Sequence, residues 1–457
     1  MISRPKKIAV MRYQNVFNAA IWLGLFSAGW SLAAYAERPL DTTPSVEESI
    51  AVHGQLTYTE QESGPFKTPY SGANSLSADR GRETVDATLF VGARLWSGAE
   101  AWVAPEVDQG FGLDGTLGAA GFPSAEAYKV GRKTPYLRLS RAFIRQTFDV
   151  DATKEMTDGS QMQLVGHQSN ERWVITVGKF SVTDIFDNNQ YAHDPKSNFL
   201  NWAAVDTGTF DYAADAWGYT VGIAAERYHG AWVARVGWMD LSNVPNSPHL
   251  EPGGHEFELL AEVEHQHTLW KQPGKWLITA YDNRGRMALL NQAVATAEQR
   301  QQPIDLSAVR HYRSRTGLSA SVEQSVSEDL GLFARLGKAS GNVEAYDFTE
   351  IDQTIGLGMA LKGTPWSRPM DTVGLVGIVN GISAARQQFL QAGGLGLLVG
   401  DGQLPHPASE RILESYYSAQ IGTKTAITLD AQLIKNPGYN SDRGPAPIYA
   451  IRLHSEF

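Results

Sequence analysis

The chain has 457 residues and a formal net charge of −10, with 39 basic and 49 acidic side chains and no cysteine. The acidic balance argues against a nucleic-acid partner, because phosphate backbones are bound by clustered Lys and Arg. A disulfide framework is excluded. So is a helical membrane protein, since mean hydropathy is −0.27 and no apolar run near twenty residues follows the N-terminal segment.

The N-terminal segment has the three parts of a secretory signal peptide. Lys6, Lys7 and Arg12 precede an apolar stretch over residues 16–33, and the small-residue site Ala-Tyr-Ala follows at 34–36. This order predicts cleavage and export from the cytoplasm. An uncleaved membrane anchor is the alternative, which the polar residues inside the apolar stretch disfavour.

We therefore expect a signal peptide at residues 1–36 and a single β-barrel domain at residues 37–457. Cleavage removes four basic residues and no acidic ones, which leaves 35 basic and 49 acidic side chains and a formal charge of −14. Twelve Trp and seventeen Tyr are many for an exported polar chain, and aromatic girdles at two membrane interfaces would use them. Aromatic residues in a soluble β core or a lectin site are the alternative.

Alternation of apolar and polar residues predicts sixteen strands, because successive side chains of a strand point to opposite faces. In a clear example, Val85, Leu89 and Val91 oppose Asp86 and Thr88. An even number of strands suits an antiparallel transmembrane barrel of the outer-membrane porin type. The predicted ranges are 50–60, 84–96, 99–107, 136–148, 172–180, 217–228, 231–240, 255–266, 275–282, 311–323, 330–338, 348–362, 371–380, 411–421, 424–435 and 447–457.

The lengths of the connections give a second test, since an outer-membrane barrel alternates short periplasmic turns with long outer loops. If the first strand runs outward, links such as 97–98 and 422–423 must be short and links such as 108–135 and 181–216 long, as they are. The link 149–171 breaks this rule. It is either a small periplasmic excursion or a sign that the predicted register is wrong there.

The strand at 255–266 indicates what the barrel encloses. Its outward set would include Phe257 and Leu259, while Glu258, Glu262 and Glu264 share the other face. A soluble sandwich would not point these carboxylates into its core, but a water-filled lumen solvates them. Sixteen tilted strands enclose a lumen too wide for side chains to fill, which favours an aqueous channel.

The last strand alternates most strictly, with Tyr449, Ile451, Leu453 and Phe457 on one face. A terminal aromatic residue on such a strand resembles the C-terminal signature of outer-membrane barrels. We expect Phe457 to lie at the periplasmic end beside the first strand, where the two close the cylinder.

Ordered motifs from about residue 76 to the end resemble the carbohydrate-selective porins of the OprB type. They are EVDQGFGL (106–113), GFPSAEAYKVG (121–131), FIRQTF (143–148), VGKFSVTDIFD (177–187), YAHDP (191–195), FLNW (199–202), GGLGLLVGDG (393–402), ESYY (414–417), NPGYNSDRG (436–444) and RLHSEF (452–457). The resemblance implies a sixteen-stranded outer-membrane porin that passes sugars such as glucose.

A glycine-rich loop at residues 109–134 is the candidate constriction loop, because it is long enough to fold inward and its glycines permit close packing against a wall. A plain surface loop is the alternative. The acidic and amide-rich stretch from Asp184 to Asp194 has no regular metal-ligand spacing. It is interpreted as a hydrogen-bonded scaffold rather than as a sugar or calcium site.

The strands beside this loop supply the candidate selective residues. Sugar hydroxyls both donate and accept hydrogen bonds, so guanidinium donors opposed to carboxylate acceptors would replace their hydration. The candidates for the channel constriction are Arg94, Glu100, Trp102, Glu106, Arg138, Arg141 and Arg145.

Two features of these candidates are decided by strand geometry. Arg138 and Arg141 are three positions apart, so they face opposite sides unless the strand is bulged, whereas Arg141 and Arg145 share a face. We therefore favour Arg141 and Arg145. Trp102 offers a flat apolar face for a pyranose ring, and a place in an interface girdle is equally open.

The expected function is diffusion of glucose and related sugars through an aqueous channel in the outer membrane of a Gram-negative bacterium. A general or ion-selective porin is one alternative, and a non-conducting barrel enzyme or adhesin is another. No catalytic motif, metal spacing or cofactor site is recognised, so no enzyme and no cofactor are expected. Expected partners are permeating sugars, outer-membrane lipid and lipopolysaccharide, with a homotrimer left open.

Overall fold

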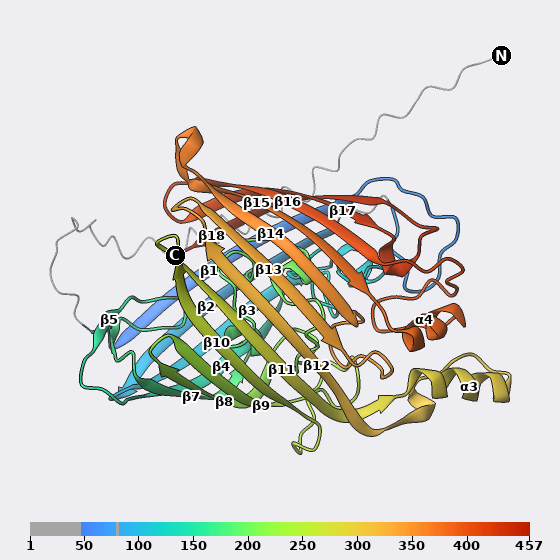
Figure 1. Ribbon diagram of the computed structural model, residues 1–457, viewed down its shortest axis with the longest axis horizontal. Helices are drawn as coiled ribbons and strands as arrows, with labels where there is room; N and C mark the ends of the chain where they lie inside the picture. The colour runs from blue at the N-terminus through green and yellow to red at the C-terminus, as the bar shows by residue number, and fades with distance from the viewer. Residues whose placement is uncertain (1–46, 79–81) are drawn as a thin grey trace, which may run out of the picture. The chain divides into compact units, whose positions relative to one another are not determined.

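The computed structural model describes residues 47–78 and 82–457, and the expected signal peptide at 1–36 lies outside them. Within this part, sixteen strands form one closed antiparallel barrel in which neighbours in sequence are neighbours in space. The first, β1 (Ile50–Ser63), pairs with the last, β18 (Ala446–Glu456), which closes the cylinder (Figure 1). The barrel confirms the predicted fold class and all sixteen predicted strands.

The other barrel strands are β2 (Arg82–Trp96), β3 (Ala99–Gly110), β4 (Tyr136–Asp149), β7 (Arg172–Phe180), β8 (Thr220–His229), β9 (Trp232–Asp240), β10 (Phe257–Leu269), β11 (Gln272–Ala288), β12 (Arg310–Ser325), β13 (Leu330–Ala339), β14 (Gln353–Gly363), β15 (Arg368–Gly381), β16 (Glu410–Ile421) and β17 (Thr425–Lys435). A separate hairpin consists of β5 (Glu155–Thr157) and β6 (Gly166–Gln168). The α-helices are α2 (Trp202–Val205), α3 (Leu290–Arg300) and α4 (Ala384–Gln391). Short 3-10 helices are η1 (Leu113–Thr116), η2 (Val182–Asp184), η3 (Ser307–Val309), η4 (Thr364–Trp366) and η5 (Pro437–Tyr439). Among the described residues, no helix is both long and apolar enough to cross a membrane.

One clear error in the predicted strand limits is at β14, which begins at residue 353 rather than 348. The cause is a distant carboxylate. Asp211 accepts hydrogen bonds from the backbone N–H groups of Phe348 (2.8 Å) and Thr349 (3.2 Å), and from the two residues before them. These donors therefore bind a side chain instead of a neighbouring strand.

The two ends of the barrel differ as the connection lengths predict. One end, here called the turn end, carries short links such as 97–98 and 230–231, and the other, the loop end, carries the long ones with α3 and α4. The exception is the 150–171 segment at the turn end, which contains β5 (left in Figure 1). Because β4 pairs directly with β7 down to Asp149 and Arg172, the predicted register is right and this segment is an excursion.

The C-terminal residue completes the closure at the turn end. Phe457 and Gly54 exchange two backbone hydrogen bonds of 2.8 and 2.9 Å. A Cβ atom at position 54 would lie 2.1 Å from the Phe457 ring, so only glycine lets the terminal aromatic ring lie against β1. This contact confirms the expected position of Phe457 beside the first strand.

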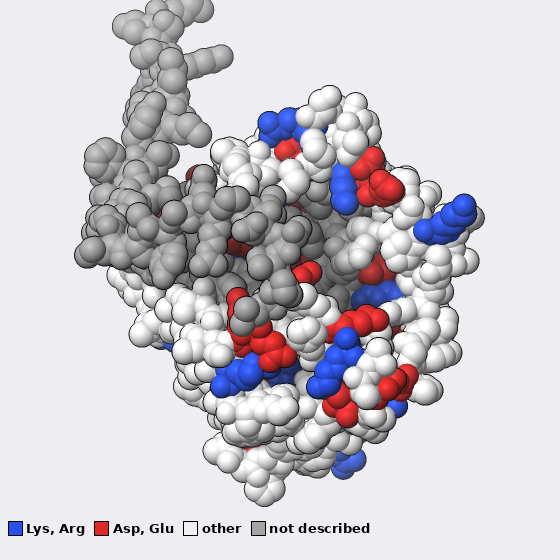
Figure 2. Space-filling view, turned by 90° about the vertical axis from the view of Figure 1, so that its left-hand side faces the viewer, with Lys and Arg blue, Asp and Glu red and all other residues white. Residues whose placement is uncertain are grey.

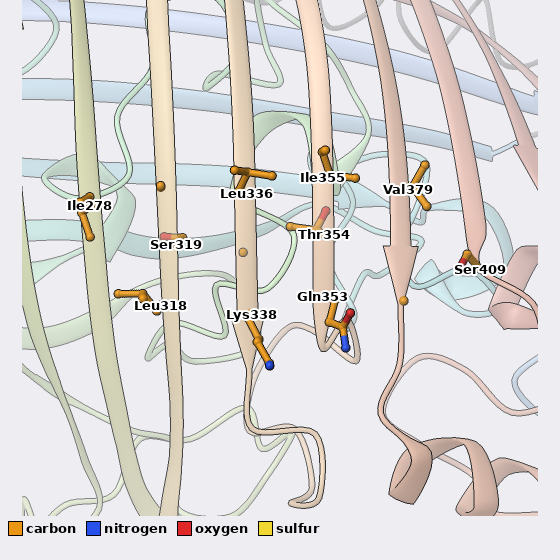
Figure 3. Close-up of a pocket in the computed structure, with 13 residues that line it drawn as sticks. Ile278, Leu318, Ser319, Leu336, Lys338, Gln353, Thr354, Ile355, Val379 and Ser409 are labelled. Atoms are coloured by element: carbon orange, nitrogen blue, oxygen red, sulfur yellow. The ribbon is translucent and has the colours of Figure 1, made fainter.

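The outer surface of the barrel is apolar. Leu357 and Leu429 on the outward face are 61% and 59% exposed, a degree of exposure that a soluble protein avoids across a whole sheet. Exposed tryptophans, among them Trp96, Trp173 and Trp232, gather at the turn end of the strands, where an interface girdle would place them. A shallow groove of about 500 Å³ crosses this face from β11 to β15, lined by aliphatic side chains such as those in Figure 3.

Two loop-end connections, 111–135 and 181–219, fold into the barrel and fill much of it. Inward carboxylates of the wall accept their backbone N–H groups: Glu258 from Ala213 (2.9 Å) and Glu414 from Leu200 (2.5 Å). The expectation that water solvates the carboxylates of β10 is thus wrong, because Glu258, Glu262 and Glu264 are all buried. Peptide groups of a buried loop need acceptors, and the wall provides them.

The hydrophobic core lies inside the barrel, among these loops. Trp202 of the 181–219 loop stacks between Phe122 and Phe348, with ring centroids 5.2 Å away on each side. Tyr212 adds a contact to Phe348 at 4.5 Å. Three loop-end connections are therefore fixed to one another by aromatic packing, which gives the interior of the channel a defined shape.

Candidate functional site

A cavity of about 300 Å³ remains between the folded-in loops and one side of the wall. We call it the central cavity. It is bounded by β1, β2 and β4, by the 111–135 and 181–219 loops, and by the 150–171 segment. Its lining residues are Gln55, Phe90, Ala125, Glu126, Tyr128, Arg141, Gln161, Met162, Ser181, Thr183, Asp184, His193, Asp194, Pro195, Lys196, Trp202, Val205, Asp206, Tyr212, Trp217, Gly218 and Tyr219.

A β-bulge in β4 brings the predicted arginines to one face. Ala104 of β3 pairs with Arg141, but the next residue, Pro105, pairs with Leu139, so Ser140 is the extra residue. This shift turns Arg138 to the same side as Arg141. The bulged alternative therefore holds, and Arg138, Arg141 and Arg145 all face inward.

Arg141 lines the central cavity and is fixed by a carboxylate of the 181–219 loop. Its Nε and Nη2 atoms each donate to Asp184 at 2.7 Å, a bidentate pair. The guanidinium also lies 4.9 Å from the centre of the Tyr219 ring. A planar group held on two sides keeps its remaining N–H groups in a fixed direction.

Arg138 is held deeper in the wall. It forms ion pairs with Glu106 and Asp108 of β3 and stacks between Tyr128 (4.8 Å) and Tyr219 (4.6 Å). Both carboxylates are 1% exposed. Arg138 and Glu106 thus position the two tyrosines, which themselves line the central cavity.

The remaining candidates lie toward the turn end. Arg145 donates to the Met162 carbonyl (2.8 Å), and Arg94 donates to the Val165 carbonyl (3.0 Å), both in the 150–171 segment. Glu100 accepts from the Trp102 indole N–H at 3.1 Å.

Trp102 itself is 1% exposed, because its ring covers the face of Gly92 and stacks with His53. This packing leaves no open face for a sugar ring. Of the seven candidates, Arg141 alone lines the central cavity.

The sequence did not single out the 181–219 loop as the main source of cavity residues. Lys196 of this loop binds both carboxylate oxygens of Glu126, at 2.9 and 2.8 Å, and forms an ion pair with Asp86. Trp202, Tyr212 and Tyr219 add aromatic surface. The signal was present as an aromatic-rich run with several aspartates. Periodicity does not show where such a segment lies, because it is neither a long helix nor a strand.

Three polar atoms of the 181–219 loop have no hydrogen-bond partner in the protein, although they are buried: His193 Nδ1, Trp202 Nε1 and Asp206 Oδ1. Their side chains all line the central cavity. Burial and Arg335 lower the pKa of His193, which keeps its ring neutral, and burial and Asp187 raise the pKa of Asp206 to about 8. Buried polar atoms without a hydrogen-bond partner are rare in proteins, which sets these three groups apart from the rest of the loop.

Metal binding has no support in the described ranges, where no three His, Asp or Glu side chains are grouped as ligands. The two cations of the cavity, Arg141 and Lys196, are instead paired with carboxylates. Figure 2, which views the turn end, likewise shows both signs of charge interspersed among the described residues.

A family model described as "Carbohydrate-selective porin, OprB family" matches residues 73–457. The chain belongs to the OprB family. It is therefore a porin that forms a channel for carbohydrates, rather than an enzyme, and the family and the barrel together place it in the outer membrane of a Gram-negative bacterium.

One solved structure supports the fold of this OprB-family porin, and two others are similar to a smaller degree. The high-pH structure of OprB from Pseudomonas putida has a TM-score of 0.67 at 15% identity, covering 90% of this chain and 94% of that one. OccAB1 of Acinetobacter baumannii has a TM-score of 0.48 at 10% identity, covering 90% and 96%. DcaP of the same species has a TM-score of 0.47 at 10% identity, covering 89% and 97%. No curated protein sequence matches the chain.

Proposed function

We propose that the central cavity is the zone in which this porin selects its solute, and that the solute is a neutral sugar such as glucose that diffuses passively. One observation carries the proposal: the cations of the central cavity are paired with carboxylates, whereas several of its polar side chains have an atom without a hydrogen-bond partner. Arg141 and Lys196 are each paired with carboxylates, while His193, Trp202 and Asp206 each have a buried polar atom without a hydrogen-bond partner in the protein.

Such a lining suits a polyhydroxy solute better than an ion. An ion would need a net charge of opposite sign, whereas hydroxyl groups need donors and acceptors in alternation. The aromatic faces of Trp202, Tyr212 and Tyr219 support the same solute class, because the C–H faces of a pyranose are apolar. Weak contacts of this kind favour entry and still permit exit.

The finer features of export and surroundings belong to the same proposal. Residues 1–36 are a signal peptide that is removed during export, which the charge, apolar stretch and small-residue site support. Residues 37–457 then form one porin domain, oriented with its turn end toward the periplasm. Its apolar outer face contacts lipid and lipopolysaccharide, and a homotrimer is the assembly to be tested by its mass in detergent.

Replacing the candidate arginines tests the selective zone. Arg141→Ala removes guanidinium donors at the cavity, and loss of one charge-assisted hydrogen bond, about 1.4 kcal/mol, weakens glucose block of the ion current about tenfold. Single-channel recording in planar bilayers measures the block. Arg145→Ala is expected to act in the same direction and less strongly, since Arg145 does not line the cavity.

Arg411→Ala is the matched control, because Arg411 lies on the exposed outer face of β16. Its block by glucose should equal that of the unmodified protein. If Arg141→Ala leaves the block unchanged while glucose still blocks, Arg141 is not part of the selective zone. Ion current without any sugar block would indicate a general porin.

A further inference from the structure

The 150–171 segment differs from every other link that the structure describes at the turn end. The others span only a few residues, whereas this one reaches back into the barrel. Its first half, residues 151–160, is exposed apart from Thr157, but Leu164 is 1% exposed and belongs to the interior hydrophobic core.

Side chains of the wall hold this second half inside the barrel. The Gln161 amide donates to Gln55 of β1 (2.9 Å) and to Glu456 of β18 (3.2 Å). Arg145 of β4 and Arg94 of β2 donate to carbonyl groups of the segment at 2.8 and 3.0 Å. Four strands on one side of the barrel thus bind it.

Backbone pairing adds to these contacts. The Glu48 backbone N–H donates to the Val165 carbonyl at 3.0 Å, and the Glu48 carboxylate accepts from the Val165 N–H at 2.9 Å. Arg94 binds the carbonyl groups of both residues. These contacts, together with the buried Leu164, make the position of residues 161–165 a property of the folded barrel and not of an exposed turn.

The connection itself does not need this length. Strands β4 and β7 are paired to their ends, and the Val150 N–H donates to the Glu171 carbonyl at 2.7 Å, so a short turn would join them. Residues of the segment instead reach the central cavity, whose lining includes Gln161 and Met162. They lie at its turn-end side, where a solute leaves for the periplasm.

We propose that residues 161–165 form a second narrow zone at the turn end of the channel, and that Gln161 and Met162 set the largest solute that passes. This proposal rests on the central cavity being the path of the solute. The zone acts by size, through a segment that the wall holds in place, and Gln161 adds an amide that can bind hydroxyl groups.

Shortening the segment tests the proposal. Residues 152–168 are replaced by Gly-Ser-Gly, which keeps the Val150–Glu171 pair, and Met162→Gly is made as a milder variant. Conductance in planar bilayers is expected to rise about twofold in the shortened protein and less in Met162→Gly, since a narrow zone limits ion flow. Polyethylene glycols of graded size, added to each side in turn, report which mouth has widened.

The matched control is Asp158→Ala, which alters an exposed residue of the same segment. It should conduct like the unmodified protein. Entry of larger polymers from one side only, together with faster liposome swelling by oligosaccharides, supports the second narrow zone. Equal conductance and equal polymer exclusion in all variants overturn it.

The two proposals fail in different ways. If glucose never blocks the unmodified channel, the sugar-selective cavity fails, while the polymer measurement still decides the size limit. If glucose blocks and shortening changes neither conductance nor polymer exclusion, the cavity stands and the second narrow zone fails.

Discussion

Asp206 is a carboxyl group buried within the channel interior, at the end of α2 in the 181–219 loop. Burial and the neighbouring Asp187 raise its pKa to about 8, and Arg335 opposes this effect. The group is therefore protonated at neutral pH and acts as a donor as well as an acceptor. A neutral carboxyl group in the cavity is consistent with an uncharged solute.

This shift predicts a pH-dependent stability. The unfolded chain releases the proton near pH 4, whereas the folded barrel retains it to about pH 8. The unfolded state binds fewer protons in this window, so the contribution of Asp206 to stability falls as pH rises from about 4 to 8 and is constant above. Asp206→Asn removes this slope.

Thermal unfolding followed by circular dichroism checks the prediction. Relative to the unmodified protein, the unfolding temperature of Asp206→Asn should increase as the pH is raised from 4 to 8. That of Asp158→Asn, at an exposed site, should show no such relative increase. A constant difference in unfolding temperature between Asp206→Asn and the unmodified protein over this range would show that the pKa of Asp206 is not raised.

At the residue scale, the sequence revealed the inward arginines but not how they are arranged. Alternation placed Arg141 and Arg145 together, and the face of Arg138 depended on a bulge at Ser140. A bulge adds one residue without changing the local pattern, so periodicity does not report it. The burial of Trp102 on Gly92 was equally hidden, because it depends on a contact between two strands.

At the scale of elements, the 181–219 loop is shaped by its partners on the wall. Glu414 of β16 accepts from the backbone N–H groups of Leu200 (2.5 Å) and Asn201 (3.2 Å). Arg452 of β18 donates to the Asn198 carbonyl at 2.9 Å. The loop is thus fixed from strands more than two hundred positions away in sequence.

Removing one such acceptor should loosen the loop. Glu414→Ala leaves two buried N–H groups unpaired, at a cost of about 1–3 kcal/mol each. We expect noisier single-channel current and faster proteolysis within the loop. Glu414→Gln, which keeps an acceptor oxygen, should be affected less, and Leu413→Ala on the outer face should not be affected in these respects. Equal current noise in Glu414→Ala and Leu413→Ala would contradict this role.

Strands and loops differ in how far sequence predicts them. Each barrel strand has one face toward lipid and one toward the interior, so a period of two marks it within a dozen residues. The two inward-folded loops have no such contrast between two faces, because both of their sides are buried. Their course follows from acceptors such as Glu258 and Glu414, whose partners lie far along the chain.

At the scale of the whole molecule, the part of the chain that the structure describes is a barrel whose interior is organised like the core of a soluble protein and whose exterior is apolar. Loops and wall leave a small cavity with paired charges and three free polar atoms. Closure by Phe457 against Gly54 secures the cylinder at the turn end. In the proposed function, the loops and side chains inside the barrel select the solute, and the strands supply the wall of the channel.

Proteoliposome swelling with glucose and with gluconate, an anion of similar size, tests the central claim most directly. A cavity with neutralised charges and free hydrogen-bonding groups predicts that glucose enters faster than gluconate and that its entry saturates with concentration. Equal rates for the two solutes, or faster entry of gluconate, would contradict selection of neutral sugars by the central cavity.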